Sequence, residues 1–242
     1  MLKINNLTVS VAGNKILDNL NLEIPDGEIH AIMGHNGTGK STLCRVILKD
    51  EEYEIMDGSI IYNDKDLTKM TTTEIAREKI FLLNQNPISI EGVSNAEMLR
   101  VALQEINEKP LSIFDFSKKM ESVCQKLDLP ESFMHREINV GMSGGERKKN
   151  ELLQMYMLEP KLILLDEVDS GLDVDAINVV AKLMNDYYKE YKPTILIITH
   201  HDKILKLIKP NVVHILSNGK ITKSGDISLA KKIEEQGFNG IN

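Results

Sequence analysis

The stretch IHAIMGHNGTGKS, residues 29–41, decides the predicted fold. Its second half matches the spacing G-x-x-x-x-G-K-S/T of a phosphate-binding loop without a gap. The apolar run 29–33 predicts a buried strand, and the segment from Lys40 to about Leu48 predicts a helix. Glycines let a backbone close around phosphate, and the free amides at a helix N-terminus point at the anion. The stretch therefore indicates a nucleotide site, and a chance glycine-rich turn is a rare alternative in this context.

The polar residues of this loop have distinct expected tasks. Lys40 is expected to reach the β- and γ-phosphates, and Ser41 to offer its hydroxyl to Mg²⁺. The predicted nucleotide-binding residues are Gly34, His35, Asn36, Gly37, Thr38, Gly39, Lys40, Ser41 and Thr42. A nucleoside triphosphate with Mg²⁺ is therefore the expected ligand.

Length, composition and charge limit the possible classes of protein. The 242 residues are enough for one substantial core and a small inserted subdomain. Apolar residues make up 42% and charged residues 27%, which is typical of a soluble globular protein. The net charge of −7, with scattered lysines and arginines, argues against a nucleic-acid partner. Cys44 and Cys124 form no C-x-x-C pair, so we expect two buried, reduced thiols.

The sequence gives no signal for targeting or membrane insertion. No apolar run approaches the roughly 18 residues that span a bilayer. The start of the chain, MLKIN, is strand-like and resembles neither a signal peptide nor a transit peptide. We therefore expect a cytoplasmic protein, in the bacterial cytoplasm first, with the stroma of an organelle as the alternative for a mature form.

Strand and helix patterns alternate over most of the chain. The expected strands are 7–11, 20–24, 29–33, 58–62, 80–83, 162–165 and 194–198, and the expected helices are 40–48, 71–79, 95–107, 115–127, one from Ser143, and 174–191. Asn218-Gly219 predicts a hairpin between 212–216 and 220–223. Strand–helix alternation implies an α/β fold with a mainly parallel sheet and right-handed crossovers.

Two segments depart from this alternation. The early alternating strands predict an antiparallel β subdomain near the N-terminus. From Pro87 to Asn139 the pattern is helical with little strand signal, which predicts an inserted helical subdomain. We therefore expect a single domain over residues 1–242, with a nucleotide-binding core at 1–86 and 140–242 and a helical subdomain at 87–139.

A second motif, LILLDE at residues 162–167, ends in two acids. Such a run is typical of a central strand that delivers carboxylates to the carboxyl edge of a sheet, where α/β proteins bind ligands. Asp166 is expected to hold Mg²⁺ through water, and Glu167 to polarise or orient the water that attacks the γ-phosphate. Acids at strand ends often serve solubility alone, but downstream of a phosphate loop this pair indicates nucleotide hydrolysis.

A third motif, MSGGE at residues 142–146, resembles the signature of the ATP-binding-cassette (ABC) ATPases, with Met for the usual Leu and Glu for the usual Gln. A serine and two glycines at a helix start present a hydroxyl and free amides, although a lone S-G-G is often an ordinary N-cap. In that family the motif caps the γ-phosphate held by a second subunit, which implies a transient ATP-dependent dimer. The residues that would act on the partner's ATP are Ser143, Gly144, Gly145 and Glu146.

Three further positions match the family in order and spacing. Gln85 falls where the family has a glutamine that contacts Mg²⁺ and water, and Asp173 ends a loop resembling the family's dimer contact. His200 follows an apolar strand, as the family's γ-phosphate-sensing histidine does, whereas His201 has the plainer interpretation of a surface residue. The resemblance implies catalytic roles for Glu167, His200 and Gln85, and Mg²⁺ contacts for Ser41, Gln85 and Asp166.

Two positions depart from the family pattern. The family often stacks an aromatic residue on adenine near the end of the first strand, where this chain has Val11. Adenine recognition is therefore expected to be looser or to rest on apolar contacts alone. His35 stands where proline is frequent in the loop. ATP rather than GTP is implied by the resemblance, not by these residues.

Stretches outside the core motifs narrow the resemblance. They are similar, from end to end, to the SufC-type ATPases of iron–sulfur cluster assembly, particularly NVG at 139–141 and EEQGF at 234–238. This resemblance implies soluble scaffold partners like SufB and SufD in place of membrane-spanning domains. The chain has no cysteine set that could hold a cluster, so its contribution would be an ATP-driven conformational change.

Two other functions stay open. The chain could be the peripheral ATP-hydrolysing subunit of a membrane ABC transporter, which neighbouring permease genes would favour. A regulatory or DNA-associated ABC protein is disfavoured by the acidic charge and by the lack of duplicated cassettes. A partner groove is expected around Gln85–Val101, with the contact at Gly92-Val93-Ser94-Asn95, because binding residues concentrate on loops; a solvent-exposed connection is the alternative.

Arg147-Lys148-Lys149 follows the signature, at a helix start where cations are slightly unfavourable. The plainer interpretation is a solvated charge run. The sharper hypothesis pairs Lys148 with Glu167 in the resting monomer, which would keep basal ATP hydrolysis low.

Overall fold

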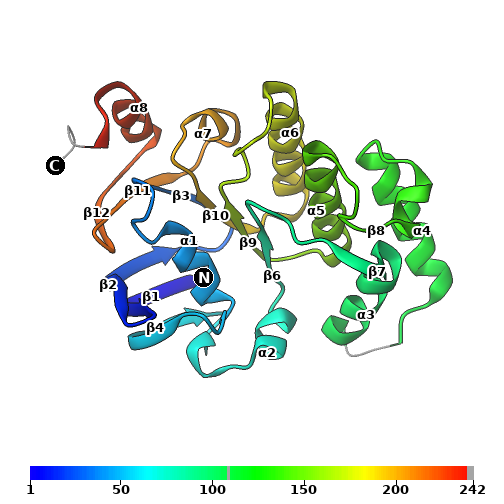
Figure 1. The fold of residues 1–242 in the computed structure, drawn as a ribbon, viewed down its shortest axis with the longest axis horizontal. Helices are drawn as coiled ribbons and strands as arrows, with labels where there is room; N and C mark the ends of the chain where they lie inside the picture. The colour runs from blue at the N-terminus through cyan, green and yellow to red at the C-terminus, as the bar shows by residue number, and fades with distance from the viewer. Residues whose placement is uncertain (108–109, 239–242) are drawn as a thin grey trace.

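The computed structural model describes residues 1–107 and 110–238 (Figure 1). Its larger sheet has the strand order β12-β11-β3-β10-β9-β6, in which β12 runs antiparallel to β11 and the other neighbours run parallel. Its strands are β3 (Ile29–Met33), β6 (Ile80–Leu83), β9 (Leu162–Asp166), β10 (Thr194–Ile198), β11 (Val212–Ser217) and β12 (Lys220–Gly225). The predicted α/β fold with a mainly parallel sheet is therefore confirmed. Residues 108–109 and 239–242, which the predicted domain limits include, lie outside the described part.

A second sheet is antiparallel and has the order β2-β1-β4-β5. It is formed by β1 (Leu2–Val11), β2 (Asn14–Ile24), β4 (Glu54–Tyr62) and β5 (Lys65–Asp66). Helix α1 (Lys40–Ile47) packs between this sheet and the larger one, because its apolar side chains share a core cluster with both (Figure 1). The predicted antiparallel β subdomain near the N-terminus is present.

The two faces of the larger sheet bury two different cores. Along β9, Leu162 and Leu164 point to the core that contains α1, whereas Ile163 and Leu165 point to the opposite core. All four side chains are fully buried. A strand covered on both faces is expected to read as a continuous apolar run, as β9 does.

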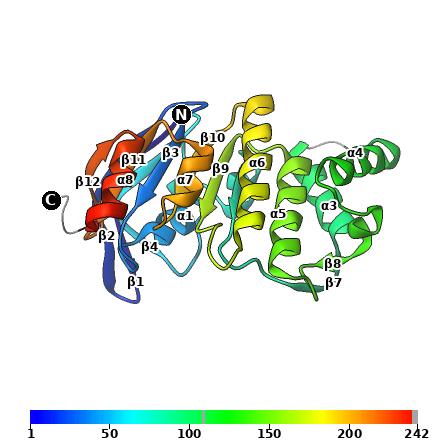
Figure 2. The same ribbon diagram turned by 90° about the horizontal axis from the view of Figure 1, so that it is seen from above.

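Four helices cover the face opposite α1. They are α5 (Gly144–Leu158), α6 (Val174–Tyr191), α7 (Lys203–Ile208) and α8 (Ile227–Gln236), and Figure 2 shows them side by side. Ser143 caps α5 and Asp173 caps α6, each through its side-chain oxygen. The helix predicted at 174–191 has the predicted bounds, whereas α7 and α8 were not predicted.

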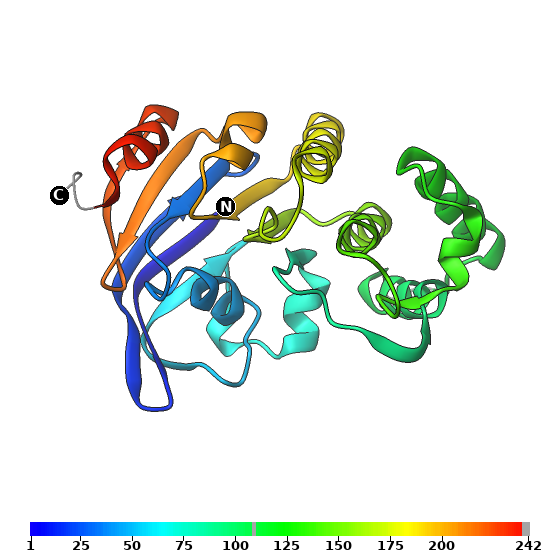
Figure 3. The same cartoon turned by 45° about the horizontal axis from the view of Figure 1, so that its top comes forward.

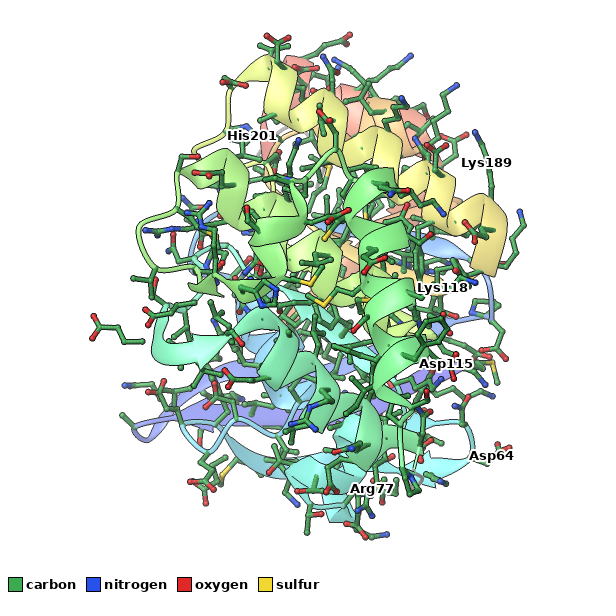
Figure 4. The ribbon with its side chains drawn as sticks, turned by 90° about the vertical axis from the view of Figure 1, so that its right-hand side faces the viewer. Asp64, Arg77, Asp115, Lys118, Lys189 and His201 are labelled. Carbon is green, nitrogen blue, oxygen red and sulfur yellow. The ribbon has the colours of Figure 1, made fainter. Side chains whose placement is uncertain are left out.

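The segment between β6 and α5 forms one end of the molecule (Figure 3). It contains α3 (Asn95–Asn107), α4 (Ile113–Lys126) and a short 3-10 helix (Glu131–His135). Figure 4 looks onto this end, where Asp115 and Lys118 mark α4. The segment also holds two strands where the sequence showed little strand signal, since β7 (Ile90–Ser94) pairs with β8 (Glu137–Ile138). A two-residue strand is too short to show an alternating pattern.

The remaining elements complete the chain. A 3-10 turn (Leu67–Lys69) and α2 (Thr72–Arg77) connect the antiparallel sheet to β6, and α2 begins at a capping box formed by Thr71 and Glu74. Cys44 and Cys124 are buried and unpaired, as predicted. Within residues 1–107 and 110–238, no helix combines the length and apolar character needed to cross a membrane.

Leu164→Ala is expected to lower the free energy of unfolding by about 2–5 kcal/mol, because it leaves a cavity between β9 and α1. Urea unfolding followed by circular dichroism measures the loss. The control is Leu207→Ala on α7, where the leucine is 36% exposed; it should cost no more than about 0.5 kcal/mol. Equal effects of the two substitutions would contradict the assigned core.

Candidate active site

The parallel register brings four distant segments to one edge of the larger sheet. Ile198 of β10 pairs with Ile32 of β3 and with Asp166 of β9, and Leu83 of β6 pairs with Leu165. The residues that directly follow these strands therefore meet at the carboxyl edge, where α/β sheets bind ligands. These residues are the loop 34–39, Asn84-Gln85, Glu167 and Thr199-His200.

The phosphate loop wraps around the lysine that follows it. The Lys40 side chain is nearly buried, and its Nζ donates to the carbonyls of Gly34 and His35, each at 2.9 Å. Burial lowers the pKa of Lys40, and the nearby Glu167 carboxylate opposes that shift. The loop therefore holds a positive charge at the start of α1, where phosphate would lie.

Two glycines in this loop have no room for a side chain. A Cβ on Gly34 would lie 2.4 Å from the carbonyl oxygen of Leu216. Gly39 has a φ of +97°, and a Cβ there would lie 2.7 Å from the Leu17 side chain. Within the described residues, no side chain caps the start of α1 at Gly39, so its amides are available to an anion.

A hydroxyl and a carboxylate suited to Mg²⁺ lie in contact beside this loop. Ser41 Oγ donates to Asp166 Oδ1 at 2.7 Å, and Asp166 is 2% exposed. Burial raises the pKa of Asp166, and the hydrogen bond from Ser41 partly offsets that shift. Hard oxygen ligands next to a phosphate loop are the set that Mg²⁺ prefers, so these residues fit the ion.

Glu167 is the centre of the site. Gln85 Nε2 donates to Glu167 Oε2 at 3.0 Å, and His200 Nδ1 lies 3.1 Å from Oε1. Lys40 Nζ lies 3.9 Å from the same Oε1. The structure thus brings the three predicted catalytic residues together beside the phosphate loop.

The backbone of Glu167 is also unusual. Its φ is +45°, which a residue with a side chain rarely adopts. Its amide donates to the Ile198 carbonyl at 2.8 Å, and this bond fixes the turn that leaves β9. Strain of this kind persists where the surrounding structure holds it, and it is frequent at functional sites.

The signature residues form a separate cluster at the start of α5. Glu146 Oε2 accepts from the Ser143 amide and hydroxyl, each at 2.9 Å, and Arg136 Nη1 donates to Glu146 Oε1 at 2.9 Å. These contacts lower the pKa of Glu146 to about 2, the Ser143 backbone contributing most. No hydrogen bond or ion pair between described residues joins this cluster to the phosphate loop.

The dimer-loop residue Asp173 lies at the start of α6, where its Oδ1 accepts from the Ala176 amide at 2.8 Å. Its exposed side chain thus caps α6 within one chain.

Val11, predicted near adenine, is the last residue of β1 and pairs with Asn14. The contact of the Phe238 ring with His35, 4.5 Å between centroids, was not predicted, because a single aromatic residue far along the chain gives no pairing signal.

Both interpretations of Lys148 are wrong. The residue is 3% exposed, so it is not solvated, and it pairs with Glu151 instead of Glu167. Its Nζ lies 2.9 Å from Glu151 Oε2 and also donates to the Asn84 carbonyl. Lys148 and Glu151 are three residues apart on the buried face of α5. The run of three consecutive cations in the sequence gives no sign that only the middle one is buried.

The site combines a phosphate loop, the Ser41–Asp166 pair and a Glu167 carboxylate bound by Gln85 and His200. This combination defines a nucleotide-hydrolysing protein of the phosphate-loop class. A family model described as "ABC transporter" matches residues 17–170. The chain belongs to this family, and it is an ATP-binding ATP hydrolase. The predicted resemblance to ABC ATPases is therefore confirmed.

Similar proteins agree with this assignment. The probable ATP-dependent transporter SufC of Escherichia coli (strain K12) is 46% identical, over 98% of this chain and 97% of its own. A probable ABC transporter ATP-binding protein of Streptococcus pyogenes serotype M3 is 43% identical, over 100% of this chain and 94% of its own. The dimeric bacterial cassette MJ0796 has the same fold, with a TM-score of 0.81 over 94% of this chain and 99% of its own, at 22% identity.

Glu146→Gln is expected to remove a pH-dependent stabilisation. The folded-state pKa of Glu146, about 2, lies below the ordinary 4.5. The contribution of this carboxylate is therefore complete above the ordinary pKa and falls as the pH drops towards the folded-state value. Urea unfolding between pH 7 and pH 3 measures it: the advantage of the wild type should be constant above pH 5.5 and shrink below it. An advantage that does not change down to pH 3 would refute the capping contacts.

Proposed function

We propose that this chain hydrolyses the γ-phosphate of ATP with Mg²⁺, using Glu167 to polarise the attacking water. The observation that carries the proposal is the position of Glu167, held by Gln85 and His200 and 3.9 Å from Lys40. A carboxylate next to a phosphate loop can accept a hydrogen bond from water in line with the γ-phosphate. His200 and Gln85 keep that carboxylate aimed at the edge of the sheet.

The other residues of the site bind and orient the triphosphate. The amides of 34–39 and the Lys40 ammonium hold its phosphates. When phosphate binds, Lys40 Nζ exchanges its hydrogen bonds to the loop carbonyls for phosphate oxygens. Ser41 and Asp166 would hold Mg²⁺, Asp166 through water, with Gln85 as a third contact. When bound, Mg²⁺ neutralises charge that develops on the phosphates. The water oxygen bonds to the γ-phosphorus as the bond to the β-phosphate bridging oxygen breaks, and ADP and phosphate leave.

A second copy of the chain would complete the site. The signature residues Ser143, Gly144 and Gly145 are exposed at the start of α5. A helix N-terminus with free amides suits the γ-phosphate of a partner's ATP. We therefore infer an ATP-dependent dimer in which Ser143–Glu146 and Asp173 act across the interface.

For the biological role, we propose an ATPase subunit of a soluble iron–sulfur cluster assembly complex. The similarity to SufC over nearly the whole of both chains supports it. SufB-like and SufD-like scaffold subunits in the cytoplasm would then be the partners, and residues 87–139 the subdomain that meets them. The surface beside Gln85 exposes Ile88 by 71% and Ile90 by 43%. The alternative is a peripheral subunit of a membrane transporter, which similarity to a probable ABC transporter ATP-binding protein favours.

Glu167→Gln is expected to lower the rate constant of ATP hydrolysis by about 10²–10⁴-fold, because an amide cannot accept the proton of the attacking water. ATP affinity, measured with a fluorescent analogue, should stay near the wild-type value. The control is Glu190→Gln on α6, remote from the edge, which should hydrolyse ATP normally. Unchanged hydrolysis by Glu167→Gln would refute the assigned role.

Affinity purification from a native lysate tests the biological role. Soluble scaffold subunits in stoichiometric yield are the expected result, and a membrane permease would establish the transporter alternative. Ile88→Glu with Ile90→Glu should abolish the capture, because both side chains lie on the proposed surface. Met56→Glu on β4 is the control, since Met56 is also largely exposed, at 60%, and lies outside residues 87–139.

A further inference from the structure

Two buried side chains of α5 hold the peptide that precedes Gln85. The Asn84 amide donates to Glu151 Oε1 at 2.8 Å, and the Asn84 carbonyl accepts from Lys148 Nζ. Lys148 and Glu151 also pair with each other, 2.9 Å between Nζ and Oε2. Both backbone groups of one residue are thus bound by one ion pair, which we name the Asn84 clamp (Lys148 and Glu151).

Both charged side chains of the clamp are almost fully buried. The Lys148 and Glu151 side chains are 4% and 5% exposed. Burial raises the pKa of Glu151, while Lys148 and the Asn84 amide oppose that shift. Removing two charges from water is unfavourable unless hydrogen bonds satisfy them, and a pair of apolar side chains is often as stable. Stability alone therefore does not explain this pair.

The same helix holds the chain again after Gln85. Asn150 of α5 donates to Asn139 Oδ1 at 3.0 Å, and Asn139 Nδ2 donates to the Ile88 carbonyl at 2.7 Å. Ser89 Oγ donates to the Asn139 carbonyl at 3.1 Å. Gln85 thus lies between two attachments to α5, and its direction depends on that helix.

We propose that Lys148 and Glu151 are positioning residues that aim Gln85 at Glu167. With Asn84 fixed at both backbone groups, the Gln85 side chain reaches Glu167 at 3.0 Å. Because α5 begins at the signature cluster, the clamp also connects the surface that meets a partner's ATP to the chain's own catalytic carboxylate. This inference rests on the proposed roles of Gln85 and Glu167.

The test replaces the clamp by apolar residues of similar size, Lys148→Met with Glu151→Leu, in the full-length chain. We expect the kcat of ATP hydrolysis to fall about ten- to hundredfold, because a small misplacement of a catalytic group has an effect of this size. The KM for ATP should change little, since neither residue touches the phosphate loop. Circular dichroism checks the fold, and Lys148→Met with Glu151→Gln, which keeps an acceptor for the Asn84 amide and leaves no unpaired buried charge, should lower kcat less than the fully apolar pair.

Lys119→Met with Glu159→Leu is the matched control. Lys119 Nζ likewise pairs with a glutamate, 2.7 Å from Glu159 Oε1, and donates to a backbone carbonyl, that of Met157, at 2.9 Å. This pair lies at the far end of α5 from the clamp, so its replacement should leave kcat unchanged.

A double-mutant cycle with Gln85→Ala separates positioning from a general structural effect. If the clamp acts through Gln85, adding the clamp substitutions to Gln85→Ala should slow hydrolysis no further. Multiplied effects, or a clamp variant with wild-type kcat, would overturn the inference. Wild-type hydrolysis by Gln85→Ala itself would overturn the proposed role of Gln85 and the clamp with it, which distinguishes the two failures.

Discussion

The parallel pairing of β3, β10, β9 and β6 is the constraint on which the site depends. Because the pairing is parallel and in register, the four strands end at the same edge of the sheet. The polar residues that follow them therefore lie side by side at that edge. Residues separated by more than a hundred positions, such as Ser41 and Asp166, therefore lie within hydrogen-bond distance. A shift of this register by one residue would point the Asp166 side chain into the apolar core, where a carboxylate without a partner is unfavourable.

Hydrogen bonds and charge pairing explain how these charged groups are buried side by side. Lys40, Asp166 and Glu167 are each at least nine-tenths buried and would be unfavourable alone. Lys40 is satisfied by loop carbonyls and Glu167 by Gln85 and His200. Each of these contacts is one that phosphate, Mg²⁺ or water can replace, so the same groups are suited to bind a nucleotide.

Most of the site could be predicted from the sequence because its signals are local. A glycine-rich loop between a strand and a helix fixes where Lys40 and Ser41 lie, and an apolar run fixes where Asp166 lies. The strong periodicity of 95–107 and 174–191 likewise gave correct helix bounds. Lys148 was misinterpreted because its pairing with Glu151 depends on which face of α5 is buried, and that face is set by the packing of its apolar side chains in the core. The strands β7 and β8 and the contact of Phe238 with His35 depend on tertiary structure in the same way.

The most direct test of the account is complementation between two inactive subunits. Lys40→Ala removes the phosphate contact of its own site but keeps the signature, and Gly144→Asp places a negative charge in the signature, at a helix start that tolerates an acid. Each variant alone should hydrolyse ATP slowly. Their mixture should recover hydrolysis, because a mixed dimer has one site with an intact loop and an intact facing signature. A mixture no faster than its components, or a fully active Gly144→Asp chain, would contradict a site shared between two copies.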